Sequence, residues 1–157
     1  MDELALAPSE RVFLEALDTP GVRYLVIGMS AALLQGARGV TGDVDLWFED
    51  TADPHIGEAA ERAGGFWISG AFGMRPPGLG GAGLDDRFDV VLTADGLDGF
   101  SEEFDKARTV EIDGLSLRVL PLARILASKR AANRPKDRAQ IPALEAAIAV
   151  EGERKDS

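Results

Sequence analysis

The stretch VTGDVDLWFED, within the first third of the chain, restricts the fold most, because apolar and other side chains alternate in it with a period of two. Val44, Leu46 and Phe48 share one face of the strand that this period predicts. The opposite face begins with Asp43 and Asp45, whose Cα atoms lie about 6.5–7 Å apart in an extended chain. Carboxylates this close repel each other, so the strand needs solvent or a cation beside them.

Periodicity, caps and breakers predict the other elements. Helices are expected over residues 9–18, 30–36, 54–63, 121–132 and 136–150, and strands over residues 22–27, 43–48, 66–69 and 87–93, followed by a hairpin that turns at Asp113-Gly114. Ser9 and Asp53 are the expected N-caps of the first and third helices. Because the hairpin adds antiparallel pairs, we expect an α/β (α+β) protein with a mixed β-sheet, flanking helices and two C-terminal helices.

Residues 1–150 are long enough for one domain, and residues 151–157 are expected to form a disordered tail. The Gly- and Pro-rich segment 70–84 is expected to be a loop, either a lid over a substrate or merely flexible. Arg75 in this loop is a candidate phosphate contact. Trp47, on the carboxylate face, either stacks on a base or packs beneath a helix.

The composition excludes several kinds of site. The 157 residues include no cysteine and one histidine, His55, which excludes disulfides and thiolate metal sites and argues against a multi-histidine site or a Ser-His-Asp triad. Any metal must therefore be held by oxygen, which favours Mg²⁺, Mn²⁺ or Ca²⁺. No apolar run reaches the roughly 20 residues that span a bilayer, and the acidic N-terminus is unlike a signal peptide. We expect a cytoplasmic protein with no membrane partner.

The net charge of −10 argues against general, non-specific electrostatic binding of nucleic acid. One segment, ARILASKRAANRPKDR, is nevertheless basic and could hold a short RNA end. Its basic residues are Arg124, Lys129, Arg130, Arg134, Lys136 and Arg138.

Three features fall at the ends or outer faces of predicted strands. The turn IGMSA leads into a helix, whose first backbone N–H groups suit a phosphate. The second feature is the pair Asp43 and Asp45, and the third is Asp89 on the outward face of RFDVVLT. Three carboxylates on neighbouring strands suit two divalent cations about 3.5–4 Å apart, as in phosphoryl or nucleotidyl transfer.

The stretch IGMSAALLQGARGVTGDVDLW resembles the signature of the DNA polymerase β-like nucleotidyltransferase superfamily, and most of all the small bacterial members related to the AbiEii toxins. The matching residues are Gly28, Ala31, Gly36, Arg38, Thr41, Asp43, Asp45 and Leu46. A second stretch, LPLARILASKRAANRPKDRAQIPALEAA, is similar to the terminal segment of that family. It matches at Lys129, Arg134, Pro135, Lys136 and Asp137.

The resemblance covers about residues 20–148 and implies a polymerase β-like fold with Mg²⁺- or Mn²⁺-dependent transfer of a nucleoside monophosphate from an NTP, such as ATP, to a hydroxyl. Asp43, Asp45 and Asp89 would be the catalytic, metal-binding carboxylates, with Asp89 also the base for the acceptor hydroxyl. The nucleotide-binding residues would be Gly28, Ser30, Thr41 and Lys129. The acceptor is open between RNA, protein and a small molecule, and the AbiEii relation suggests a toxin–antitoxin setting with an antitoxin partner.

Two other functions remain open. Met29 stands where the family has a second small residue, and Gln140 stands where it often has an aspartate. These differences favour, as an alternative, a non-catalytic nucleotidyltransferase-like domain that binds a nucleotide or a protein. The same three carboxylates would also serve adenylylation of an aminoglycoside.

Overall fold

The computed structural model of the protein describes residues 5–70 and 76–156. Its helices are α1 (Pro8–Asp18), α2 (Gly28–Leu34), α3 (Pro54–Arg62), α4 (Leu84–Arg87), α5 (Phe100–Lys106), α6 (Leu122–Ala132) and α7 (Pro135–Asp156). Its strands are β1 (Tyr24–Ile27), β2 (Val44–Phe48), β3 (Phe66–Ile68), β4 (Gly78–Gly80), β5 (Phe88–Val91), β6 (Arg108–Ile112) and β7 (Leu115–Val119).

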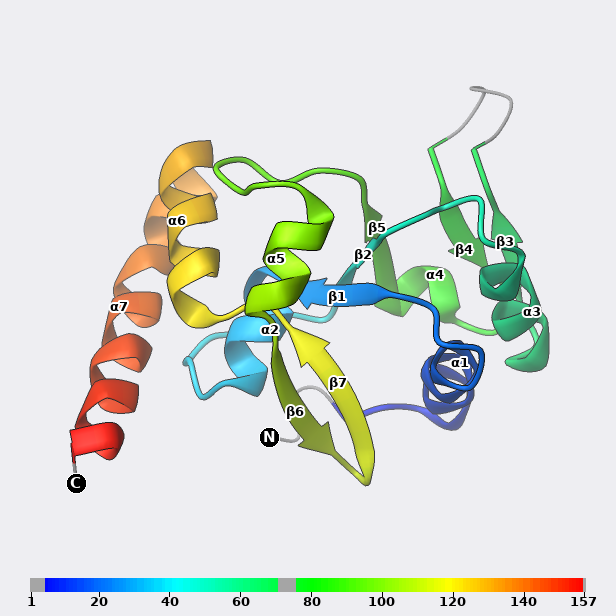
Figure 1. Ribbon diagram of the computed structural model, residues 1–157, viewed down its shortest axis with the longest axis horizontal. Coiled ribbons are helices and arrows are strands. Elements are labelled where there is room, and N and C mark those ends of the chain that lie inside the picture. The colour runs from blue at the N-terminus through cyan, green and yellow to red at the C-terminus, as the bar shows by residue number, and fades with distance from the viewer. Residues whose placement is uncertain (1–4, 71–75, 157) are drawn as a thin grey trace.

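Five strands form the main sheet, in the order β5-β2-β1-β7-β6, while β3 and β4 form a separate antiparallel pair. Strand β1 is antiparallel to β2 and parallel to β7, and β2 is parallel to β5. Figure 1 shows the β6–β7 hairpin projecting from the sheet, with β3 and β4 at the opposite end of the molecule from α6 and α7. The mixed directions confirm the predicted mixed sheet.

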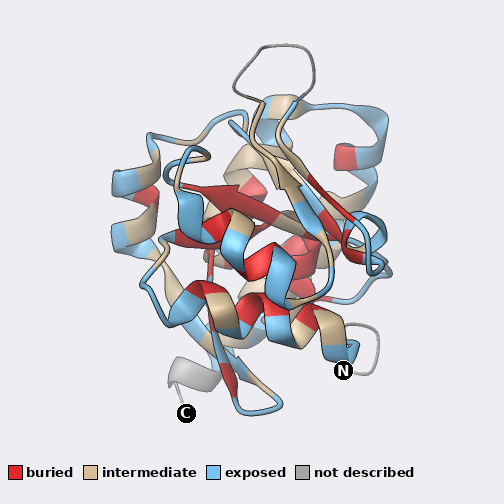
Figure 2. Ribbon diagram, turned by 90° about the vertical axis from the view of Figure 1, so that its right-hand side faces the viewer, coloured by how far each residue is buried: buried red, intermediate tan, exposed pale blue. Residues whose placement is uncertain are grey.

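Helices cover both faces of the sheet, so the central strands are buried on both sides. On one face the ring of Phe13 in α1 packs 5.2 Å from that of Phe88 in β5. On the other face Phe100 of α5 meets Trp47 of β2 edge-on at 5.4 Å. Figure 2 shows the buried residues gathered on the central strands and on the inner sides of the helices. Trp47 therefore packs beneath a helix, which was one of its two expected roles.

The start of α1 differs from the prediction. Ser9 is not the N-cap, because the helix begins at Pro8 with Ala7 as its cap. Glu10 accepts a hydrogen bond from the backbone N–H of Ala7 at 2.9 Å and so satisfies that end of the helix. The Ser9 hydroxyl instead donates to the carbonyl of Ala82 at 3.1 Å. The predicted cap of α3 is confirmed, since a side-chain oxygen of Asp53 accepts from a backbone N–H in the first turn.

Three further segments differ from what the sequence led us to expect. Segment 70–84 holds β4, in which Gly80 leaves room for the ring of Phe66, and residues 71–75, with Arg75, lie outside the described residues. Helix α5 was not expected, because its seven residues are too few to show a helical period. Helix α7 continues through Asp156, where a disordered tail was expected.

In the described part of the chain, no helix combines the length and the apolar character that crossing a membrane requires.

Candidate functional site

Gly28 is the first residue of α2 and follows β1 directly. Its φ of +67° lies in the left-handed region, and a Cβ there would overlap Oδ2 of Asp45. Both the conformation and the close approach therefore require glycine. The carboxylate of Asp45 lies against the backbone at the start of α2 as a result.

Strand register brings the three predicted carboxylates to one end of the sheet. Asp45 is the partner of Ile27 in β1 and of Asp89 in β5. Asp43 immediately precedes the first residue of β2, and its carboxylate acts electrostatically on that of Asp89.

Two of the carboxylates at this end of the sheet have raised pKa values, because burial and neighbouring carboxylates outweigh the positive charges near them. Burial and then the charge of Asp89 raise the pKa of Asp45 to about 6, although Lys129 opposes the rise. The pKa of Asp89 is also raised, first by burial and then by the charge of Asp43. A divalent cation bound beside these carboxylates would relieve the repulsion between their charges.

Ser30 supports Asp45 rather than lining an open site. Its side chain is 1% exposed. The hydroxyl donates to the carbonyl of Ile27 at 2.9 Å and accepts from the backbone N–H of Asp45 at 3.2 Å. The protein therefore already uses this hydroxyl to support the backbone of Asp45, and a contact of Ser30 with a triphosphate stays a prediction.

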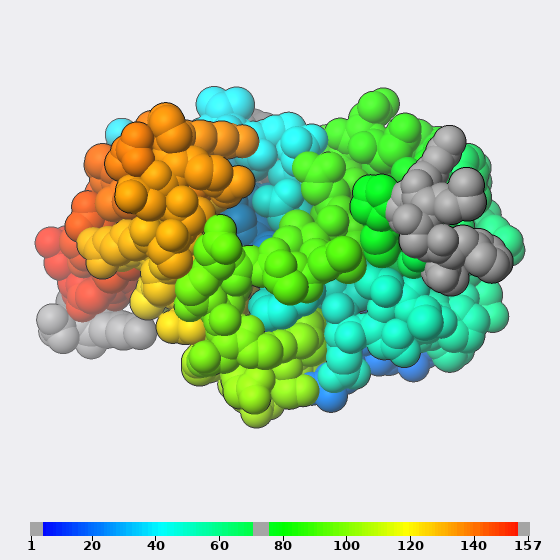
Figure 3. All heavy atoms as spheres, turned by 90° about the horizontal axis from the view of Figure 1, so that it is seen from above, coloured from blue at the N-terminus to red at the C-terminus, as the bar shows by residue number. Residues whose placement is uncertain are grey.

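A cleft of about 390 Å³ opens beside Asp45. It is lined by Ile27, Gly28, Asp45, Val91, Thr93, Ala94, Asp95, Leu97, Leu120, Ile125, Ser128, Lys129, Ala132, Arg134 and Asp137. Figure 3 shows a hollow between the yellow and orange atoms of α6 and α7 and the green atoms that follow β5. Gly28 and Lys129, two of the predicted nucleotide-binding residues, thus share one cleft with a predicted catalytic carboxylate.

The wall of the cleft opposite the sheet is basic, and a buried carboxylate organises it. Asp137, whose side chain is 1% exposed, accepts from Nε of Arg134 at 2.6 Å and lies 3.4 Å from Nζ of Lys129. The hydrogen bond from Arg134 lowers the pKa of Asp137 to about 2. Asp137 also accepts from the backbone N–H of Arg134, which ties the start of α7 to the end of α6. Asp137 therefore holds Lys129 and Arg134 at the cleft.

The three carboxylates, Asp43, Asp45 and Asp89, are suitable ligands for a hard cation such as Mg²⁺. Their side chains are not arranged around one common position. No group of three acidic or histidine side chains within residues 5–70 and 76–156 is arranged to hold a metal. Asp45 lies against Gly28, while Asp43 and Asp89 lie outside the residues that line the cleft. Asp43 and Asp89 are exposed, so turns of their side chains would bring more oxygens toward Asp45.

The segment that follows β5 forms part of the site, which the sequence did not reveal. Gly96 has a φ of +73°, and a Cβ there would lie 2.6 Å from the Cβ of Ala131 and 3.1 Å from the carbonyl oxygen of Ala127. This close approach holds the segment against α6, where Thr93, Ala94 and Leu97 line the cleft. The Asp95-Gly96 pair was the only local signal of such a turn.

Two other predicted positions lie near the cleft. Thr41 accepts a hydrogen bond from the backbone N–H of Asp43 at 3.3 Å, so it shapes the turn before β2, and its contact with a nucleotide stays a prediction. The side chain of Met29 is buried, with its Cε 3.5 Å from where a Cβ of Gly39 would stand. Met29 therefore packs into the core and does not crowd the turn at Gly28.

No family model matches this chain, and no curated protein sequence matches it. Solved structures do match. The fold is that of a nucleotidyltransferase. A crystal structure of ANT(2'')-Ia in complex with adenylyl-2''-tobramycin is 18% identical with a TM-score of 0.59, covering 92% of this chain and 88% of that chain. A solution structure of the antibiotic-resistance factor ANT(2'')-Ia is 16% identical, with a TM-score of 0.57. The match covers 94% of this chain and 84% of that chain. At this identity the likeness establishes the fold, which confirms the predicted fold class.

Proposed function

We propose that the protein is a nucleotidyltransferase that uses Mg²⁺ or Mn²⁺ and moves a nucleoside monophosphate from an NTP to a hydroxyl. The observation that carries this proposal is the position of Asp45 beside Gly28, in a cleft whose opposite wall presents Lys129. Asp89 is the register partner of Asp45 on the neighbouring strand, although it does not itself line the cleft. Carboxylates on one side and a cation on the other suit a metal-bound triphosphate. The nucleotidyltransferase fold supports the same reaction class.

In this reaction the acceptor oxygen forms a bond to the α-phosphorus, and the bond from that phosphorus to the pyrophosphate oxygen breaks. Asp89, exposed at the sheet edge and with a raised pKa, would accept the proton of the hydroxyl. Lys129 would neutralise charge on the departing pyrophosphate. Asp43 and Asp45 would hold the metal, which supplies Lewis acidity and charge neutralisation when bound.

A small polyhydroxylated amine such as tobramycin is the acceptor we propose to test first. The ligand of one matching structure is an adenylylated tobramycin, and the net charge of −10 favours a cationic partner over RNA. The basic segment that suggested an RNA end is largely paired within the protein. Arg124 binds Glu103, Arg130 binds Glu145 and Arg134 binds Asp137.

The deciding experiment incubates the protein with Mg²⁺, each labelled NTP and separate pools of aminoglycosides, cellular RNA and cellular protein. Label should enter one pool with the natural protein and with Asp105→Asn, which changes an exposed carboxylate that does not line the cleft. Label should be lost with Asp43→Ala/Asp45→Ala. Transfer that survives the double substitution, or no transfer to any pool, contradicts the proposal. A pool of protein or RNA labelled instead of aminoglycoside would overturn only the acceptor and would favour the toxin–antitoxin setting.

A non-catalytic nucleotide-binding domain is the second candidate, and one observation favours it. The three carboxylates are not arranged around a metal in the described part of the chain. If this candidate is right, calorimetry will show NTP binding that Mg²⁺ does not strengthen. Binding that requires Mg²⁺ and is lost in the double variant would exclude it.

A further inference from the structure

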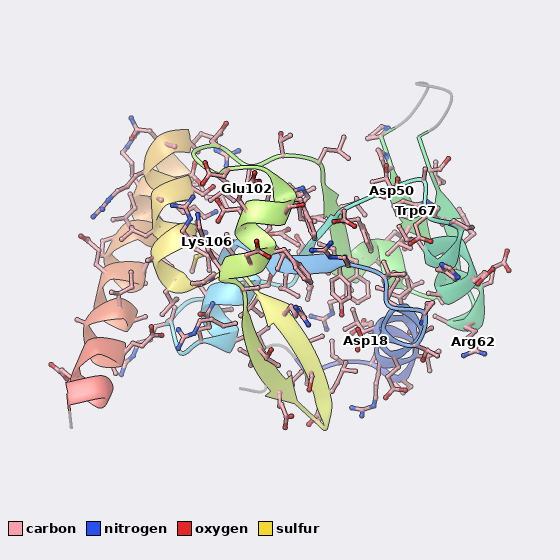
Figure 4. All side chains as sticks on the ribbon, in the orientation of Figure 1. Asp18, Asp50, Arg62, Trp67, Glu102 and Lys106 are labelled. Atoms are coloured by element: carbon pink, nitrogen blue, oxygen red, sulfur yellow. The ribbon has the colours of Figure 1, made fainter. Side chains whose placement is uncertain are left out.

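A second hollow, of about 360 Å³, lies at the C-terminal end of α5 and shares no lining residue with the cleft. It is lined by Asp18, Gly21, Val22, Arg23, Tyr24, Phe104, Thr109, Ser116 and Arg118. In Figure 4 the labelled Asp18 marks the end of α1 on one side of this region, and Lys106 marks the end of α5 on the other. The floor is the outer face of the β6–β7 hairpin, where Thr109 is the register partner of Arg118.

Two guanidinium groups converge on one aromatic ring in this hollow. The Cζ atom of Arg23 lies 4.4 Å from the ring centroid of Phe104, and that of Arg118 lies 4.7 Å from the same centroid. Each contact is favourable, because the ring face is electron-rich. Two positive charges nevertheless border the same hollow, and repulsion between like charges raises the free energy of the folded protein.

Carboxylates of the protein compensate only one of these charges by direct contact. Arg23 forms an ion pair with Glu49 at 3.0 Å. Arg118 forms no ion pair in the part of the chain that the structure describes, and its guanidinium contacts the ring of Phe104. Asp18 acts on Arg118 electrostatically without an ion-pair contact, and burial raises the pKa of Asp18. The hollow therefore has positive charge and a nearby acceptor but no internal anion that joins the two arginines.

Hydroxyl groups complete the polar lining. Thr109 and Ser116 lie on the same face of the hairpin as Arg118, on its two antiparallel strands. Ser116 donates weakly to Glu111 at 3.3 Å, so its hydroxyl can turn toward another acceptor. A planar guanidinium with neighbouring hydroxyls is the donor set that recognises the oxygens of phosphate and carboxylate.

We propose that this hollow binds a small oxyanion, a phosphate or a carboxylate, that bridges the guanidinium groups of Arg23 and Arg118 and accepts a hydrogen bond from Thr109 or Ser116. Asp18 at the rim favours an anion that carries its own hydroxyl donor, such as hydrogen phosphate. The site stands apart from the proposed nucleotidyl transfer, because no residue is shared with the cleft.

The test is NMR chemical-shift mapping with inorganic phosphate and, in a separate arm, acetate, at constant ionic strength set with sodium chloride. The amide signals of Phe104, Thr109 and Ser116 should shift and saturate in at least one arm. Arg118→Gln should weaken this binding at least about tenfold, since a charge-assisted hydrogen bond is lost. Arg118→Lys, which keeps the charge without the guanidinium fork, should weaken it less. Which arm binds more tightly identifies phosphate or carboxylate as the preferred group.

The controls separate the two phosphate-binding regions. Lys129→Gln removes a cation from the cleft and should leave the shifts at Thr109 and Ser116 unchanged, and Arg62→Gln tests an exposed arginine outside both hollows. Shifts confined to Gly28 and other cleft residues would overturn the proposal. So would equal affinity in the natural protein and Arg118→Gln, provided that the variant retains the natural spectrum elsewhere.

Discussion

Asp45 takes its position from neighbours in two other elements, α2 and β5, rather than from β2 alone. Gly28 gives room to its carboxylate, Ser30 accepts from its backbone N–H, and Asp89 is its partner across the parallel strands. The sequence motif predicted the carboxylates and also assigned Gly28 and Ser30 to a phosphate, and those two contacts stay predictions. The spacing of residues in the sequence indicates which of them lie near one another. The hydrogen bonds of Ser30 and the burial of Asp45 depend instead on how α2 packs against the sheet.

Gly28→Ala should destabilise the protein by about 2–4 kcal/mol, because the new Cβ meets the Asp45 carboxylate in a left-handed conformation. Gly36→Ala is the matched control, since Gly36 also has a positive φ, of +100°, but nothing lies within 4 Å of its added Cβ. That control should cost about 1 kcal/mol. The free energy of unfolding measured in urea gives both values, and equal losses would show that Asp45 does not occupy the space.

Tyr24→Phe should leave stability unchanged or raise it by up to about 1 kcal/mol. Tyr24 is 4% exposed, and its hydroxyl is without a hydrogen-bond partner among the described residues. Burial also raises the pKa of this phenol, so the group stays neutral at ordinary pH. Thermal unfolding of the variant measures the effect, and a marked loss of stability would reveal a partner for the hydroxyl.

At the scale of elements, two buried carboxylates fasten helices to one another. Glu103 in α5 is fully buried and accepts from Arg124 of α6 at 2.9 and 2.6 Å. It also accepts from the backbone N–H of Asp98 at 2.8 Å, which holds the end of the segment that lines the cleft. Asp137 does the same at the junction of α6 and α7. Both walls of the cleft thus depend on single acidic side chains.

Glu103→Gln should lower the free energy of unfolding by about 2–3 kcal/mol, because Arg124 would lose its buried counter-charge. The hydrogen bond from Arg124 holds the pKa of Glu103 below its usual value, so the effect should be present at neutral pH. Glu102→Gln, one residue earlier and exposed, should change stability by less than about 0.5 kcal/mol. Chemical denaturation distinguishes the two, and similar values would mean that the buried pair contributes nothing.

Asp137 predicts a defined dependence of stability on pH. Its pKa falls from 3.8 to about 2 on folding, so its stabilising contribution is complete above about pH 4 and is lost as the pH falls toward 2. Asp137→Asn should cost about 1–2 kcal/mol at pH 7, after allowance for the solvent around Arg134. Unfolding experiments from pH 2 to 7 should show the difference between the natural protein and the variant shrinking only below pH 4. A difference that is constant over this range would contradict the ion pair.

At the scale of the whole molecule, the long and strongly patterned elements were predictable. The strand that holds Asp45, the hairpin at Asp113-Gly114 and the two C-terminal helices all follow from local period and turn chemistry. The order β5-β2-β1-β7-β6 did not follow, because strand pairing is decided by packing between distant segments. The segment held against α6 at Gly96, which forms one wall of the cleft, was missed for the same reason, whereas α5 was missed because it is too short to show a helical period.

Binding of a nucleotide should stabilise the whole molecule by mass action. With Mg²⁺ and an NTP at a hundred times the dissociation constant, the free energy of unfolding should rise by about 2.7 kcal/mol. The rise should disappear in Asp43→Ala/Asp45→Ala and persist in Asp105→Asn, as followed by thermal unfolding. An equal rise in all three proteins would place the nucleotide away from the carboxylates.

The parallel pairing of β2 with β5 also has a consequence for folding. Asp45 and Asp89 become neighbours only after the intervening chain, which includes α3, β3, β4 and α4, has closed on itself. Such long-range closure is entropically costly and slow compared with forming a hairpin. A fragment that ended before β5 would carry the entire Asp-x-Asp motif and still lack the strand that supports it. Ligand binding at this cleft therefore reports that the chain has finished folding.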